Sequence, residues 1–152
     1  MSIASRVLST RWLVRAPIPI FRHGFGWLFG RRLLLLEHVG RTSGHPRYVV
    51  LEVVVPEGPD AVIVASGFGP RAQWFRNVVA TPACHVTLGR TRRAAVAEVL
   101  DRGELDRVLA DYARRHPRAW RRLSATMLEL NGQPADGSPD IPLVRLVLGE
   151  AT

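Results

Sequence analysis

The chain has 152 residues, of which 47% are hydrophobic, and its 21 basic residues, all of them arginine, exceed its 13 acidic residues to give a formal net charge of +8. This length corresponds to one domain with a single core, and the absence of any uncharged apolar window of about 18 residues argues against a membrane-spanning helix. Cys84 is the only cysteine and the five histidines lack paired ligand spacing, so neither an intrachain disulfide nor a metal site is expected. We therefore expect a globular, cytoplasmic protein.

The positive charge is concentrated in the first third of the chain. Residues 1–47 contain eight arginines and one acid, Glu37, which gives +7, whereas the remaining 13 arginines and 12 acids give +1. Such a field attracts nucleic acid, anionic lipid or an anionic cofactor, and the charge alone does not choose among them. No aromatic–basic RNA-binding signature accompanies it, so a nucleic-acid partner is not expected.

Residues 1–30 form a basic, aromatic N-terminal segment. Residues 2–16 are compatible with a helix that Pro17 and Pro19 end, and residues 21–29, FRHGFGWLF, add a second apolar stretch. Two interpretations remain open: a flap that covers one mouth of the core, or a surface that contacts a membrane peripherally. A cytoplasmic location with membrane association is compatible with the second.

The remaining chain, 31–152, alternates short apolar runs with turns rich in glycine and proline. The predicted elements are strands at 33–39, 48–55 and 61–65, a helix that starts near Pro70 and ends before Thr81, strands at 84–88 and 91–100, helical segments at 101–116 and 120–130, and a strand at 143–148. Asp101 and Glu104 form a capping pair at the start of the first late helix. About six antiparallel strands joined by tight turns favour a mainly β fold with helices, a small closed or split barrel.

Two polar loops flank the second and third predicted strands. The bend Arg41–Arg47 places guanidiniums, hydroxyls and flexible backbone amides together, which suits an anionic, oxygen-rich ligand, although an ordinary solvated turn has the same composition. The loop and helix Ser66–Asn77 add Arg71, backbone amides at Ser66 and Gly67, an aromatic wall from Trp74, and a directional amide at Asn77. Because a hairpin separates the loops, both are expected at one end of the sheet. Together they describe a site for a planar ring with an anionic tail.

These motifs resemble those of a known family. The combination of GRTSGHPR, ASGFGPRAQWFRNVVATP and DYARRHP is similar to the deazaflavin (F420)-dependent nitroreductases, which are split-barrel proteins, and the resemblance covers roughly residues 30–148. It implies a split β-barrel cofactor-binding domain and an oxidoreductase. In that family, hydride moves from reduced F420, whose tail carries phosphate and glutamates, to a small or lipophilic acceptor such as a quinone, an enone or a nitro compound.

The resemblance also implies the cofactor-binding residues, namely Arg41, Thr42, Ser43, Gly44, Pro46, Arg47, Ser66, Gly67, Arg71, Gln73, Trp74 and Asn77. Family members often carry a basic residue at the positions of Thr42 and Gly67. This departure keeps open a relative that binds FMN, haem or a fatty acid in the same barrel, with or without catalysis.

The proton donor is not identified by the sequence. Ser66, Tyr112, His116 and water are the candidates, since no acid–base pair stands out. Tyr112 lies on the apolar face of its predicted helix, which core packing already explains, and His116 sits at that helix's end.

Overall fold

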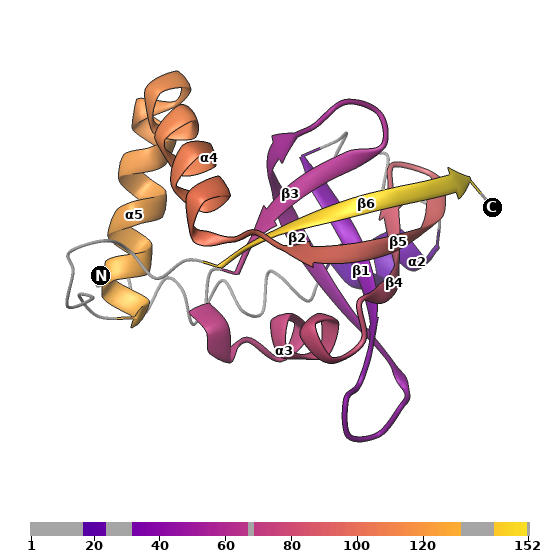
Figure 1. Cartoon of the computed structure of the whole chain (residues 1–152). Helices are drawn as coiled ribbons and strands as arrows, with labels where there is room; N and C mark the ends of the chain where they lie inside the picture. Colours follow the sequence, from indigo (N-terminus) through magenta and orange to yellow (C-terminus); the bar gives the residue numbers. More distant parts are fainter. Residues whose placement is uncertain (1–16, 24–31, 67–68, 132–141, 152) are drawn as a thin grey trace.

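A computed structural model describes residues 17–23, 32–66, 69–131 and 142–151. Six strands form a closed barrel in the order β1-β2-β3-β6-β5-β4 (Figure 1), and all neighbouring strands are antiparallel. The bounds are β1 Leu33–Val39, β2 Pro46–Pro56, β3 Ala61–Ala65, β4 Ala83–Leu88, β5 Thr91–Val99 and β6 Leu143–Ala151. The predicted barrel of about six antiparallel strands is confirmed. Each strand prediction holds to within about three residues at either end.

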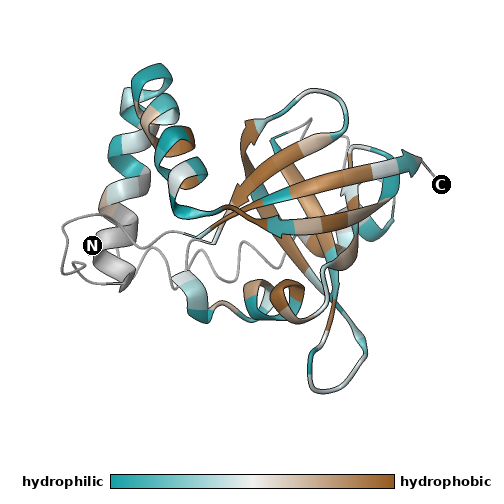
Figure 2. Cartoon of the chain, in the orientation of Figure 1, coloured by the Kyte–Doolittle hydropathy of each residue, from teal (hydrophilic) through white to brown (hydrophobic). Residues whose placement is uncertain are grey.

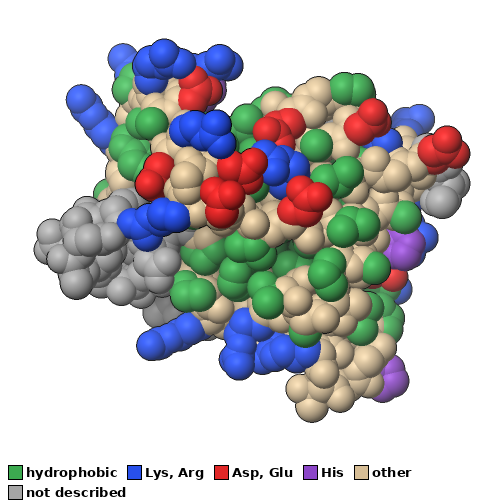
Figure 3. Space-filling view, in the orientation of Figure 1, with side chains coloured by type: hydrophobic (Ala, Val, Ile, Leu, Met, Phe, Trp, Pro, Cys, Tyr) green, Lys and Arg blue, Asp and Glu red, His purple; other side chains and the backbone are tan. Residues whose placement is uncertain are grey.

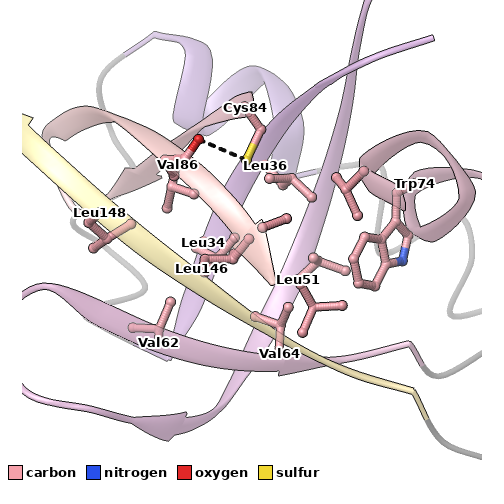
Figure 4. Packing of buried hydrophobic residues seen from close by; sticks show 14 of the residues in the cluster. Leu34, Leu36, Leu51, Val62, Val64, Trp74, Cys84, Val86, Leu146 and Leu148 are labelled. Carbon is pink, nitrogen blue, oxygen red and sulfur yellow. Dashed lines mark hydrogen bonds between the residues drawn. The ribbon is translucent and has the colours of Figure 1, made fainter. Parts of the chain in front are cut away.

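Alternation along the strands builds the barrel interior. On β1, Leu34 and Leu36 point inward and are fully buried, and they join a core to which every strand contributes. Figure 2 shows the strands as the most hydrophobic part of the molecule. Trp74, which lies on a helix and not on a strand, packs into the same core beside Leu51 and Val64 (Figure 4). Burying an aromatic ring of this size contributes strongly to the stability of the barrel end.

Helices connect and cover the strands. Their bounds are α2 Pro17–Arg22, the 3-10 turn η2 Gly69–Arg71, α3 Gln73–Ala80, α4 Arg102–Arg115 and α5 Pro117–Asn131. In Figure 1, α3 lies beneath the barrel, whereas α4 and α5 stand together at its upper left. The α4–α5 pair packs through Leu109 on a second cluster that includes Ile63, Leu100 and Leu143. None of the helices in the described ranges is long and apolar enough to cross a membrane.

Local predictions near helix ends are partly confirmed and partly wrong. The Asp101 side chain accepts a hydrogen bond from the Glu104 backbone N–H at 2.8 Å, as the predicted cap requires. Pro17 begins α2, because proline fits the first helical turn, where its missing N–H is not needed. Pro70 was expected in the first turn of the helix that follows the loop, but it lies in η2, before α3 begins at Gln73. The predicted helix at 2–16 falls outside the described residues.

Candidate functional site

The Arg41–Arg47 bend joins β1 to β2 and closes on itself. The Gly40 N–H donates to the His45 carbonyl at 2.9 Å, and the Gly44 N–H donates to the Gly40 carbonyl at 2.8 Å. Gly44 has a φ of 72°, which only glycine adopts without strain, and the Ser43 hydroxyl accepts from the His45 N–H at 3.2 Å. All seven residues of the bend are exposed, Thr42 and Pro46 included. The bend is thus a folded turn that presents its side chains to solvent.

Arg41 fastens this bend to α3. The Asn77 Oδ1 accepts from the Arg41 backbone N–H at 3.1 Å and from Arg41 Nη1 at 2.8 Å, and Gln73 Oε1 accepts from Arg41 Nη2 at 2.9 Å. The two segments predicted to lie at one end of the sheet therefore meet through direct hydrogen bonds. Because both acceptors are neutral amides, the positive charge of Arg41 stays uncompensated at this contact.

His38 belongs to the same network, although it was not among the predicted site residues. Its ring is 4% exposed, and its Nδ1 lies 3.0 Å from Asn77 Nδ2. Burial, together with the charge of Arg47 on the neighbouring strand, lowers the pKa of His38 to about 4. The alternation of side chains along β1 could have identified it. His38 follows Leu34 and Leu36 at every second position and so continues the inward face of β1.

Ser66 has a structural role in the loop before α3. Its side chain is 0% exposed, and its hydroxyl donates to the Gly69 carbonyl at 2.5 Å. The backbone amide of Ser66, expected to be free for a ligand, instead donates to the Pro142 carbonyl at 2.9 Å, so that expectation is wrong. This amide continues the pairing between β3 and β6, which the sequence could not show without the strand order. Gly67 lies outside the described residues.

The cations around α3 are exposed. Arg47 at the bend, Arg71 at the end of η2 and Arg76 on α3 form no ion pair within the described part of the chain. In Figure 3 arginine side chains gather along the lower edge, around η2 and α3, while the acidic side chains gather higher, around α4 and the strands beside it. Clustered guanidiniums without carboxylate partners favour an anionic ligand.

Tyr112 and His116 lie elsewhere. Both belong to the C-terminal end of α4, where their ring centroids are 5.2 Å apart. Tyr112 is half-buried, and burial together with the charge of Glu52 raises its pKa. Among the described residues, no hydrogen bond, ion pair or ring contact joins either side chain to the bend or to α3. No group of three metal-binding side chains is found in the same ranges.

An open groove of about 770 Å³ borders the other side of the bend. Its walls come from the end of β1, the start of β4, the middle of β5 and the later part of β6, and most of its side chains are small and apolar. Val96 and Val147 on this wall are exposed. The lining residues include His38, Gly44, Pro46, Thr81, Ala83, Cys84, His85, Ala94, Val96 and Val147.

Comparisons with known proteins agree with this arrangement. The model of the F420H2-dependent quinone reductase family matches residues 22–134. A curated protein of Mycobacterium tuberculosis, provisionally named an F420H2-dependent quinone reductase, is 34% identical over 77 residues. That alignment covers 49% of this chain, and this chain spans only 64% of the relative's length.

Solved structures share the fold. The structure of an F420-H2 dependent reductase, FDR-A, superposes with a TM-score of 0.54 at 21% identity, over 77% of this chain and 95% of that one. A pyridoxamine 5'-phosphate oxidase-related, FMN-binding protein of Nostoc punctiforme superposes with a TM-score of 0.51 at 17% identity, over 88% and 79% of the two chains. At these identities the likeness establishes the fold alone, which is the predicted split-barrel type.

Proposed function

The chain belongs to the F420H2-dependent quinone reductase family, and from this membership we propose that it is a reductase that uses reduced F420 to reduce a small or lipophilic acceptor, with quinones as the main class and enones and nitro compounds as further acceptors. The observation that carries the proposal is the direct contact between the Arg41–Arg47 bend and α3, since the two halves of the family motif meet there.

The residues at this place fit the anionic part of the cofactor. Arg41, Arg47 and Arg71 are exposed guanidiniums without carboxylate partners among the described residues, and Thr42 adds an exposed hydroxyl. Guanidinium binds phosphate and carboxylate through paired, charge-assisted hydrogen bonds. We assign the phosphate and glutamate tail to this set. Arg71, four residues after Gly67 in the sequence, supplies a charge that Thr42 and Gly67 do not carry.

Several of the remaining site residues position α3, Arg41 and the loop before α3 without reaching the ligand themselves. Trp74 is buried in the barrel end and fixes the position of α3, while Asn77 and Gln73 fix Arg41 on the exposed side of that helix. Ser66 secures the loop next to α3. Reduced F420, when bound, would supply a hydride. The protein's own residues would bind the tail and orient the ring beside α3.

The acceptor's proton comes from solvent in this proposal. The Ser66 hydroxyl is buried and already donates to Gly69, and Tyr112 and His116 lie at the end of α4. A solvent proton is sufficient for acceptors whose reduced oxygen reaches water, because the bend, Pro70 and Arg71 are exposed.

A double substitution tests the tail assignment. Arg41→Ala with Arg47→Ala removes two charged donors, and hydrogen bonds to charged groups contribute about 1.5–3 kcal/mol each. We therefore expect F420 affinity, measured by fluorescence titration, to fall roughly 100-fold or more. The matched control is Arg107→Ala with Arg118→Ala, two exposed arginines of α4 and α5 whose loss changes the net charge equally. Equal affinities of the two double variants would overturn the assignment.

A further inference from the structure

The hydrogen bonds around Asn77 determine which nitrogen of His38 carries the proton. The Arg41 backbone N–H and the Arg41 guanidinium can only donate, so the Asn77 atom that faces them, 3.1 and 2.8 Å away, is the carboxamide oxygen. The opposite atom, Nδ2, can only donate, and it faces His38 Nδ1 at 3.0 Å. Nδ1 must therefore be the unprotonated acceptor. The ring is neutral, with its proton on Nε2.

We propose that His38 is a positioning residue for the Arg41–Arg47 bend: its neutral ring fixes the orientation of the Asn77 carboxamide, which in turn holds Arg41 against α3. The positioning of Arg41 stands on the contacts alone. Its consequence for F420 rests on the function proposed above.

The network has one satisfactory orientation. Asn77 and His38 are each only 4% exposed. Bulk water therefore cannot replace the hydrogen bond between Asn77 Nδ2 and His38 Nδ1, and losing it would leave two buried polar atoms without a partner, which is unfavourable. If the carboxamide turned over, Nδ2 would meet the Arg41 N–H and guanidinium, donor against donor, and the oxygen would meet His38 Nδ1, acceptor against acceptor. The donors of Arg41 and the acceptor on His38 both disfavour this arrangement, and His38 is the partner that holds the Nδ2 end of the carboxamide.

The surroundings of His38 keep the ring neutral. It continues the inward row of Leu34 and Leu36, and its partner across the strand pair is Arg47. A second positive charge beside Arg47 in a buried place is unfavourable, and the pKa of about 4 agrees with a neutral ring near neutral pH. Glu37, the adjacent carboxylate, pairs with Arg92 on β5. It therefore has its own cation and is not directed at His38.

The consequence for binding is preorganisation. Arg41 is exposed, and a long exposed guanidinium samples many rotamers unless it is held. The Asn77 oxygen holds its backbone and its side chain at once, so the bend and the charge are placed before a ligand arrives. Losing the acceptor on His38 releases both contacts, and the ligand must then supply the ordering itself.

Three variants test this role. His38→Leu removes the acceptor and keeps the apolar volume, and His38→Asn keeps an acceptor oxygen near the Nδ1 position. His23→Leu is the matched control, an exposed histidine that follows α2 and takes no part in the network. We expect F420 affinity to fall roughly tenfold in His38→Leu, to be largely restored in His38→Asn, and to stay unchanged in His23→Leu. A purely structural histidine would not be rescued by asparagine. Equal affinities of folded His38→Leu and His38→Asn would overturn the proposal.

An NMR measurement separates this proposal from the cofactor assignment. Nitrogen-15 spectra of the ligand-free protein at neutral pH should show His38 with a protonated Nε2 and an unprotonated Nδ1. In Asn77→Asp the carboxylate replaces the amide donor, so His38 should acquire a proton on Nδ1. A protonated Nδ1 in the wild type, or an unchanged ring in Asn77→Asp, would overturn the role of His38. If both spectra are as expected but the protein does not bind F420, only the cofactor assignment is refuted, and the role of His38 stands.

Discussion

Acidification should destabilise the protein through His38, by an amount that its environment determines. The pKa of His38 is about 4 in the folded state, against 6.5 for an ordinary histidine. Between these values the unfolded chain binds a proton that the folded protein does not, so the free energy of unfolding decreases as the pH falls through this window. One unit of pKa corresponds to about 1.36 kcal/mol. His38 should therefore remove about 2 kcal/mol of stability by about pH 5 and about 3 kcal/mol by about pH 4.

The assay is urea unfolding of the wild type and His38→Asn at several pH values between about 7.5 and 4. Asparagine does not titrate, and the difference between the two curves cancels the contributions of other titrating groups. We expect the two proteins to lose stability in parallel above about pH 6.5 and the wild type to lose more below it. Curves that stay parallel down to about pH 4 would show that the histidine is not desolvated in the folded state and would contradict its lowered pKa.

Three further outcomes are expected. Asp101→Ala should lower the free energy of unfolding by about 1 kcal/mol in urea titrations, because it removes the N-cap of α4, and an unchanged value would contradict that cap. Cys84 should resist alkylation until the protein unfolds, since burial raises its thiol pKa to about 11; rapid labelling of the native protein would contradict its burial. Trp74→Ala should cost about 3–5 kcal/mol in thermal or urea unfolding, and a loss below about 1 kcal/mol would show that the ring does not close the barrel end.

The barrel was predictable because its strands follow simple rules. β1 was located correctly because Gly40, Gly44 and Pro46 exclude a helix after the leucine run, and the tight turns fixed antiparallel neighbours. A small closed or split barrel was predictable as a fold class, but the pairing of β3 with β6 that closes it was not. Sequence neighbours do not reveal which distant strands pair, and for this reason the Ser66 amide was wrongly expected to be free.

The part of the candidate site that lies within the two sequence motifs was predictable. Arg41, Gln73 and Asn77 were expected near one another, and their hydrogen bonds confirm the contact. His38 was missed because the residues before it were interpreted only as a buried apolar strand. Its inward direction points to a role in the site only when Asn77 is known to lie next to it. The ion pairs of Arg145 were not predictable from the sequence. Arg145 is half-buried on β6 and pairs with Glu57 and Glu104, carboxylates from distant segments of the chain.

We propose that the bend and α3 hold the anionic tail of F420. Titration of the purified wild-type protein with F420 and with FMN under identical conditions, with the Arg41→Ala, Arg47→Ala double variant in parallel, tests this assignment. We expect saturable F420 binding that is tighter than FMN binding and that is severely weakened in the double variant. Tighter binding of FMN, or F420 binding that does not depend on the two arginines, would contradict it.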